Sequence, residues 1–209
     1  MIYGLTGASC SGKTTLGIQL SQKLGIPFVP TKITELASEL KLPSPVSNLN
    51  LMERMNVQFR LMHGMKIFLD NLTTPCIIDR TPIDLIAYMF AEINMYSLVE
   101  EPAGIDDSLI DFYYSCIELA AKHISRLYCL DYLTNYELDI KRPPVGEAYQ
   151  LHCQLLIKGA MSQLSFEGVA ARCLPPDTPL EERVKLIYKD ITEDIASRLL
   201  AKAKLKTLN

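Results

Sequence analysis

Eight residues near the start of the chain have the types and the spacing of a phosphate-binding loop. They match the pattern G-x-x-x-x-G-K-[ST] and are Gly7, Ala8, Ser9, Cys10, Ser11, Gly12, Lys13 and Thr14, with Thr15 directly after them. In such a loop, backbone N–H groups surround a β-phosphate, the lysine reaches the β and γ oxygens, and the final hydroxyl ligates Mg²⁺. These nine residues therefore predict a binding site for ATP and Mg²⁺.

The segments on either side of this loop provide the context that the motif requires. Residues 1–6 form an apolar run that predicts a buried strand, and Leu16, Leu20 and Leu24 are spaced as on one face of a helix. Gly25 follows, where a glycine commonly ends a helix. A strand, a phosphate loop and a helix in this order distinguish a nucleotide site from an accidental glycine-rich turn.

A second group of reactive side chains follows the apolar segment 75–79. Asp79 ends this segment and Arg80 comes directly after it. At the carboxyl edge of a sheet, beside the strand at 1–6, the pair would project into the same crevice as the loop. Phosphoryl transfer requires such a carboxylate and such a cation. A turn-capping Asp beside a solvated Arg is the alternative, and Asp84 is predicted to brace the next helix.

Apolar runs alternate with helical patterns along the chain, which predicts a parallel sheet with crossover helices. We expect strands at 1–6, 26–29, 75–79, 124–130 and 166–174. We expect helices at about 15–24, 34–40, 50–71, 82–95, 108–122, 147–162 and 179–203. The connections are predicted at 43–48, 97–107, 134–146 and 175–179. This order predicts a three-layer α/β fold of the P-loop NTPase class, with about five parallel strands flanked by helices.

Length and composition limit the class of protein. The 209 residues suit one domain, 48% of them are hydrophobic, and no apolar run approaches the ~18 residues of a membrane helix. No signal-peptide pattern opens the chain, so we expect a cytoplasmic protein with no membrane partner. The net charge of −3 weighs against a long nucleic-acid duplex as an obligatory partner.

The six cysteines are scattered, without a C-x-x-C pair or a histidine at zinc spacing. Neither a disulfide framework nor a structural metal site is expected, and the thiols are predicted to be reduced and mostly buried. Cys10 differs because it lies in the phosphate loop. There oxidation would obstruct the nucleotide. A small residue that simply fits the loop is the favoured interpretation.

The phosphate loop, the segment from Asp79 to Tyr88 and an intervening helix that carries Glu53 and Gln58 resemble the P-loop nucleoside and nucleotide kinases. The chain is most similar in kind to small phage and bacterial deoxynucleoside kinase-like proteins, thymidylate kinase and the nicotinamide-riboside kinases. This resemblance implies a five-stranded parallel sheet with a small mobile lid. It also implies transfer of the γ-phosphate of ATP to a bound hydroxyl or monophosphate.

The resemblance assigns domain limits and catalytic roles. It implies one kinase domain over 1–209, with an acceptor-binding insertion at about 30–72 and the lid at about 134–150. Lys13 and Thr14 match the loop lysine and the Mg²⁺ ligand. Asp79 matches the acidic residue that acts as base or metal-associated carboxylate, and Arg80 matches the arginine that binds substrate or the transferring phosphate.

Five further side chains are candidates for binding the acceptor: Glu35, Arg54, Gln58, Arg60 and Tyr88. The amide of Gln58 offers one donor and one acceptor to a base edge, and Arg54 or Arg60 is available for a substrate phosphate. Tyr88 is placed to stack on a ring. Each of the five is also an ordinary residue of a helix surface or core.

The resemblance also implies an arginine-bearing lid and a contact to adenine. Arg142 is the candidate lid cation and Lys141 is the second choice, with a solvated charge run as the alternative. The turn at 175–179 is implied to approach the adenine. A homodimer, common in kinases of this type, stays open.

Three functions follow from these features. The first is an ATP-dependent kinase whose acceptor is a nucleoside or a nucleoside monophosphate. The second is a kinase that acts on a hydroxyl of DNA, such as a hydroxymethylated base in phage DNA modification. The third is an ATPase switch without a phosphoryl acceptor. Such ATPases carry a glutamate after the aspartate to activate water, whereas this chain has Arg80 after Asp79, which favours transfer.

Overall fold

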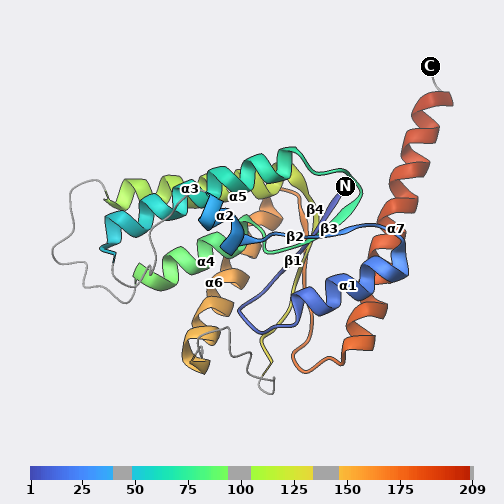
Figure 1. Cartoon of the computed structure of the whole chain (residues 1–209). Helices are drawn as coiled ribbons and strands as arrows, with labels where there is room; N and C mark the ends of the chain where they lie inside the picture. Colours follow the sequence, from blue (N-terminus) through green and yellow to red (C-terminus); the bar gives the residue numbers. More distant parts are fainter. Residues whose placement is uncertain (40–48, 94–104, 134–145, 208–209) are drawn as a thin grey trace.

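Five parallel strands form the centre of the molecule in the computed structural model, which describes residues 1–39, 49–93, 105–133 and 146–207 (Figure 1). The strands are β1 (Ile2–Thr6), β2 (Phe28–Pro30), β3 (Cys76–Asp79), β4 (Ile124–Cys129) and β5 (Ala170–Cys173). Their order in the sheet is β2-β3-β1-β4-β5. All four pairings are parallel. The predicted sheet of about five parallel strands is therefore confirmed.

Side chains alternate along the central strands between the two faces of the sheet, and both faces are covered. Tyr3, Leu5 and Ile77 belong to one buried cluster, which α1 (Lys13–Leu24) and α7 (Leu180–Thr207) complete. Burial on both faces explains why these strands read as continuous apolar runs. Each fully buried aliphatic side chain contributes about 1.5–3 kcal/mol to folding.

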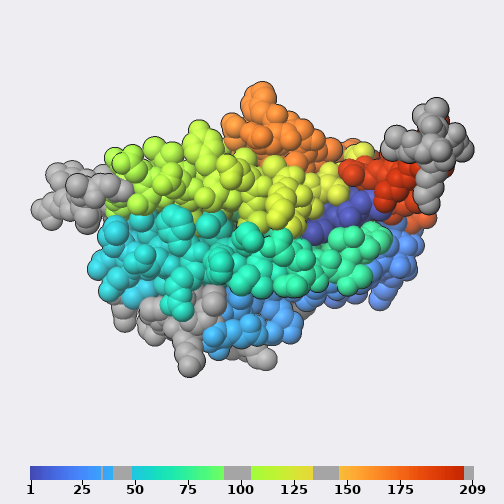
Figure 2. All heavy atoms as spheres, turned by 90° about the horizontal axis from the view of Figure 1, so that it is seen from above, coloured from blue at the N-terminus to red at the C-terminus, as the bar shows by residue number. Residues whose placement is uncertain are grey.

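Four helices cover the opposite face of the sheet. They are α3 (Leu51–Asp70), α4 (Pro82–Ile93), α5 (Ile105–His123) and α6 (Glu147–Phe166). Their apolar sides meet Ile2, Cys76 and Ile78 in the larger buried cluster. Figure 2 shows α3 and α5 side by side, and Lys122 of α5 donates to Asp70 Oδ1 of α3 at 3.2 Å. The helix α2 (Ile33–Glu39) packs against α3, so the predicted three-layer arrangement is confirmed.

The register of the sheet aligns the segments that follow the central strands. Leu5 of β1 pairs with Asp79 of β3 on one side and with Tyr128 of β4 on the other. The phosphate loop, Arg80 and Leu130 therefore leave the sheet at the same edge. Carboxyl edges of this kind are where parallel α/β sheets bind ligands.

One predicted strand is wrong in its first half. The apolar run at 166–174 predicts a strand throughout, but Phe166 is the last residue of α6 and β5 is Ala170–Cys173. The helix continues to Phe166 because Leu164 is completely buried. Its burial continues the helical spacing of the apolar residues of α6. Gly168 then adopts a left-handed φ of 82°, which separates helix from strand.

Other predicted boundaries shift by a few residues. The segments expected at 26–29, 108–122, 147–162 and 179–203 correspond to β2, α5, α6 and α7 with the bounds given above. The predicted connection at 97–107 is wrong at its end, because α5 already begins at residue 105. The side chain of Ile105, the first residue of α5, is buried in the core. Its packing starts the helix within the polar segment that the sequence predicted as a connection.

Parts of the predicted segments lie outside the described residues. These parts are 40–48 of the insertion, 94–104, and 134–145 of the lid with Lys141 and Arg142. The lid cation, the limits of the domain and its insertion therefore stay predictions. Within the described ranges, no helix combines the length and the apolar character that crossing a membrane requires.

Candidate active site

The phosphate loop joins β1 to α1 through two glycines whose conformation other residues adopt poorly. Gly7 has a φ of 146°, and a Cβ at this position would collide with the carbonyl oxygen of Leu130. Gly12 caps α1 with a φ of 82°. Both values lie in the region that favours glycine, so the spacing of the two glycines sets the shape of the loop.

The side chain of Lys13 is folded back across the loop. Its Nζ donates to the carbonyl oxygens of Gly7 and Ala8 at 2.6 and 2.9 Å and to Ser11 Oγ at 3.1 Å. Burial lowers the pKa of Lys13 to about 8, although the nearby carboxylate of Asp84 opposes the shift. The hydrogen-bond partners of this buried ammonium group among the described residues are all neutral, so the group can bind an anion.

Asp79 lies beside the loop, and its carboxylate faces the first helical turn of α1. Thr14 Oγ1 donates to Asp79 Oδ2 at 2.8 Å, and the backbone N–H of Thr31 donates to Asp79 Oδ1 at 3.0 Å. A hydroxyl and a carboxylate thus meet at the loop's edge. Hard oxygen donors of this kind fit Mg²⁺, which is held in nucleotide sites by one or two protein oxygens and the phosphates.

Arg80 is held in a strained backbone conformation at the exit of β3. Its φ is 57°, and its N–H donates to the carbonyl oxygen of Leu5 at 3.0 Å. Its guanidinium lies 5.4 Å from the centre of the Tyr88 ring. Burial opposes the charge, but Tyr88 and Asp84 keep the pKa of Arg80 above its ordinary value. Such strain, of about 1–3 kcal/mol, is typical of functional sites.

Tyr88 connects this arginine to the loop, because its hydroxyl lies 2.9 Å from Ser9 Oγ. The side chain predicted to stack on a substrate ring therefore contacts two other predicted site residues. Asp84 braces the start of α4, as expected: its Oδ2 accepts from Thr6 Oγ1 at 2.9 Å and from the backbone N–H of Thr81 at 2.7 Å. The other oxygen of Asp84 is buried and has no hydrogen-bond partner among the described residues.

Three side chains that the sequence does not single out hold the outside of the loop. The N–H of Ala8 donates to Gln154 Oε1 at 3.0 Å, and Gln150 Nε2 donates to the carbonyl oxygen of Ser9 at 3.0 Å. Arg183 Nη1 donates to the carbonyl oxygen of Ser11 at 3.0 Å. These side chains come from α6 and α7. The only signal in the sequence is that residues 150 and 154 carry amides one helical turn apart.

A cavity of about 370 Å³ opens next to the loop. Its lining comes from the loop, from the segment after β4 and from the start of α7. The lining residues are Gly12, Thr15, Leu133, Asp177, Thr178, Pro179, Leu180 and Arg183. The predicted adenine-contacting turn at 175–179 thus supplies three of these residues.

Two of the predicted acceptor residues, Gln58 and Arg54, are buried on α3. Gln58 is 8% exposed, and its Oε1 is buried without a hydrogen-bond partner among the described residues. Arg54 is also buried, and its Nε donates to the carbonyl oxygen of Leu49 at 3.0 Å. A buried amide oxygen without a partner costs free energy, which makes Gln58 Oε1 a candidate acceptor for a ligand's donor.

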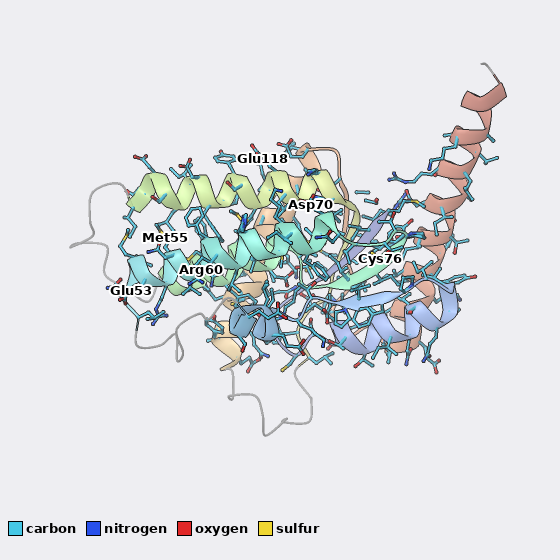
Figure 3. All side chains as sticks on the ribbon, turned by 45° about the horizontal axis from the view of Figure 1, so that its top comes forward. Glu53, Met55, Arg60, Asp70, Cys76 and Glu118 are labelled. Carbon is cyan, nitrogen blue, oxygen red and sulfur yellow. The ribbon has the colours of Figure 1, made fainter. Side chains whose placement is uncertain are left out.

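The remaining candidates lie at the surface. Glu35 pairs with Lys32 at 2.8 Å, and both side chains are exposed. Arg60 is exposed on α3, and Glu53 lies at the far end of the same helix (Figure 3). Glu53 Oε2 accepts from the backbone N–H of Asn50, so it caps the helix rather than pointing to the loop.

The fold and this arrangement of side chains can now be compared with known proteins. A protein-family model described as an AAA domain matches residues 3–121, which is more than half of the chain. The chain belongs to this family. The matched range of the AAA domain contains β1 from its second residue, the phosphate loop, β3 and Arg80. No curated protein matches the sequence.

Solved structures of kinases share the fold of this AAA domain protein. Deoxyadenosine kinase from M. mycoides is 16% identical, with a TM-score of 0.63 over 92% of this chain and 99% of that chain. Thymidylate kinase from Candida albicans is 16% identical, with a TM-score of 0.59 over 92% and 91% of the two chains. The NadR protein is 12% identical, with a TM-score of 0.59 over 92% of this chain and 48% of that chain. The predicted resemblance to P-loop nucleoside and nucleotide kinases is therefore confirmed at the level of the fold.

Proposed function

We propose that the protein is an ATP-dependent kinase that transfers the γ-phosphate to a nucleoside or a nucleoside monophosphate. The observation that carries the proposal is the 2.8 Å hydrogen bond between Thr14 and Asp79, with the strained Arg80 as the next residue. It joins the phosphate loop to a carboxylate and a cation on a neighbouring strand. Phosphoryl transfer depends on this kind of positioning and charge stabilisation more than on covalent chemistry.

The donor nucleotide occupies the loop and the adjoining cavity in this proposal. Backbone N–H groups of the loop bind the β-phosphate, and Lys13 exchanges its carbonyl partners for the β and γ oxygens. The adenine enters the 370 Å³ cavity beside Thr15 and Pro179. Three backbone contacts from Gln150, Gln154 and Arg183 keep the loop in shape before ATP arrives.

Thr14 and Asp79 are the residues that would hold Mg²⁺. When bound, the ion neutralises charge on the phosphates. Asp79 is within hydrogen-bond reach of Thr14 and so lies near the γ-phosphate position, where its carboxylate can also accept the proton of an attacking hydroxyl. Arg80, turned towards Tyr88 by its left-handed backbone, stabilises charge on the transferred group or on an acceptor phosphate.

The acceptor binds beside α3 in this proposal, where the unpartnered Oε1 of Gln58 accepts a hydrogen bond from a base. The M. mycoides deoxyadenosine kinase is described with bound dCTP and with bound dATP, and these ligands support a nucleoside-type acceptor. Arg54, Arg60, Glu35 and Tyr88 are kept as further acceptor contacts, together with a lid cation at Arg142 or Lys141. One domain over 1–209 and a homodimer are part of the same proposal.

Hydrolysis without an acceptor is less well supported. An ATPase needs a base to activate water, and Arg80 occupies the position after Asp79 where a glutamate would do so. A cation at that position stabilises a phosphate but does not accept a proton. This difference favours transfer over hydrolysis.

The test is to follow labelled phosphate from γ-labelled ATP into a panel of nucleosides, nucleoside monophosphates, plain DNA and hydroxymethylated DNA. We expect the label on a nucleoside or a monophosphate. Label retained on DNA would instead identify a polynucleotide kinase. Free phosphate in every reaction, with no labelled acceptor, would reject both kinases and leave the ATPase switch.

Asp79→Asn tests the role of the carboxylate. We expect kcat to fall about 10²–10³-fold while the affinity for ATP in the absence of Mg²⁺ changes little, because the amide still pairs with Thr14 but accepts no proton. Asp70→Asn, which changes a carboxylate on the surface of α3, is the matched control. Equal losses in kcat and in metal-free ATP affinity would show that Asp79 only maintains the loop.

A further inference from the structure

Two cysteines lie opposite each other at the carboxyl ends of β4 and β5. Cys129 and Cys173 are register partners in the parallel pairing of these strands, so their side chains project to the same face of the sheet. Neighbouring strands are about 4.8 Å apart. Disulfides join residues whose Cα atoms are about 4.4–6.8 Å apart. The backbone therefore already holds the two residues at bridging distance.

The two thiols differ in exposure and in acidity. Cys129 is completely buried, whereas Cys173 is exposed. A hydrogen bond from Cys129 lowers the pKa of Cys173 to about 7, against a desolvation effect, and the positive charge of Lys158 adds to the lowering. The same hydrogen bond, together with burial, raises the pKa of Cys129. Cys173 is thus an accessible thiol that is partly ionised near neutral pH, and Cys129 is a protected thiol beside it.

The buried member of the pair is linked to the phosphate loop by one side chain. Gln154 Nε2 donates to Cys129 Sγ at 3.1 Å and to Asp131 Oδ1 at 2.8 Å. Its Oε1 accepts from the N–H of Ala8 in the loop at 3.0 Å. The amide therefore spans from the thiol pair to the phosphate loop, and a change at the sulfur reaches the loop through a single residue.

We propose that Cys129 and Cys173 form a reversible cross-strand disulfide by exchange with a low-molecular-weight disulfide. The thiolate of Cys173 attacks one sulfur of the small disulfide, which forms a mixed disulfide and releases one thiolate. Cys129 then attacks Cys173 Sγ, which breaks the mixed disulfide, and the proton of Cys129 goes to the departing small thiolate, which leaves as the second thiol. Two protein thiols are oxidised and one small disulfide is reduced to two thiols.

The bridge also changes the support of the phosphate loop. A disulfide sulfur directed towards Cys173 is a poorer acceptor for Gln154 than a thiol, so Nε2 keeps only the Leu130 carbonyl oxygen and Asp131 Oδ1 as acceptors, and the amide shifts relative to Ala8. We therefore expect oxidation to weaken ATP binding several-fold. The bridge itself does not depend on the proposed kinase activity, because it can be detected without any substrate.

The chemical test treats the folded, full-length protein with oxidised glutathione and maps the cysteine-containing peptides by mass spectrometry. We expect a peptide pair joined through Cys129 and Cys173 that a thiol reductant separates. Cys129→Ser should instead retain glutathione on Cys173, since the second thiol is missing. Two results with the wild-type protein would overturn the proposal. Either glutathione stays on Cys173, or Cys173 remains unmodified while Cys10 reacts.

The functional test compares ATP affinity before and after oxidation in the wild type and in the Cys129→Ser/Cys173→Ser double variant. The double variant retains Cys10, so it separates oxidation in the loop from oxidation of the strand pair. We expect a several-fold loss that is confined to the wild type and reversed by reductant. An unchanged affinity in the bridged wild type would refute the link through Gln154, and absence of ATP binding in reduced protein would refute nucleotide binding instead.

Discussion

The two halves of the candidate site differ in how completely their polar groups are satisfied. In the nucleotide half, formed by residues 7–14 and their neighbours, Lys13 makes three hydrogen bonds and both oxygens of Asp79 accept. In the acceptor half, formed by α2 and α3, the buried Oε1 of Gln58 has no described partner and Glu35 is exposed. Lys13 and Asp79 are thus satisfied without a ligand, although Asp84 Oδ1 nearby has no described partner, whereas Gln58 leaves a hydrogen bond that the proposed acceptor would complete.

This difference separates general from specific recognition. A triphosphate is the same in every reaction of such a protein, so a loop that is fixed in advance binds it with little reorganisation. The acceptor decides specificity, and an unpartnered amide rejects molecules that lack the matching donor. In the proposed kinase, the preformed loop would carry the part of the function that is common to all such reactions, and buried groups of α3 such as Gln58 would carry the specificity.

The largest effect is expected for Lys13→Ala, which tests whether the nucleotide half carries the reaction. Phosphoryl transfer should fall about a thousandfold or more, because the γ-phosphate loses its cation. Circular dichroism should show an unchanged fold, since the hydrogen bonds of Lys13 to described residues all lie within the loop. Lys23→Ala, further along α1, is the control. Near-normal transfer by the Lys13 variant would show that the loop is not the donor site.

Gln58→Leu examines the acceptor half. The KM for the acceptor should rise roughly 10- to 100-fold while the KM for ATP stays the same, because only the base loses a hydrogen bond. The free energy of unfolding should not fall, since the change removes a buried oxygen without a partner. Gln58→Glu keeps the shape of the side chain and serves as the matched variant. A stability loss without a change in acceptor KM would mean that Gln58 is a core residue.

The pH dependence of ATP binding tests the nucleotide half alone, through the ionisation of Lys13. Lys13 has a pKa of about 8 in the free protein, and bound phosphates would raise it. Binding then takes up a proton as the pH rises through 8, so affinity is nearly constant below about pH 7 and falls about tenfold between pH 7.5 and 9. Isothermal titration calorimetry at several pH values measures this slope. Lys13→Arg should abolish it, and a slope that persists in this variant would point to another group.

Gln154→Leu should have the smallest effect on binding and a clear effect on stability. The variant leaves the N–H of Ala8 without its partner, which costs about 1–3 kcal/mol in the free energy of unfolding. ATP affinity should fall only a few-fold because the other two anchors of the loop remain. Thermal denaturation and ATP titration measure the two effects, and Gln163→Leu on the same helix is the control. If neither measurement changes, Gln154 does not support the loop.

Much of the fold could be predicted from local patterns. The strand before the loop, the helix after it and the strand ending at Asp79 all have the predicted positions, because buried parallel strands and amphipathic helices have distinct periods. The boundary between α6 and β5 could not be predicted locally. Phe166 suits a strand by propensity, but packing of the preceding turn keeps it in the helix.

The sequence by itself determined the chemistry of the loop, since glycine positions, Lys13 and Thr14 define a phosphate site through covalent structure and backbone freedom alone. It also determined that Asp79 and Arg80 end a buried strand. The sequence led us to expect this strand beside β1, but only the tertiary structure established that adjacency and the contact between Thr14 and Asp79. The supports from Gln154 and Arg183 come from residues more than 140 positions away, and no local pattern encodes contacts over such separations.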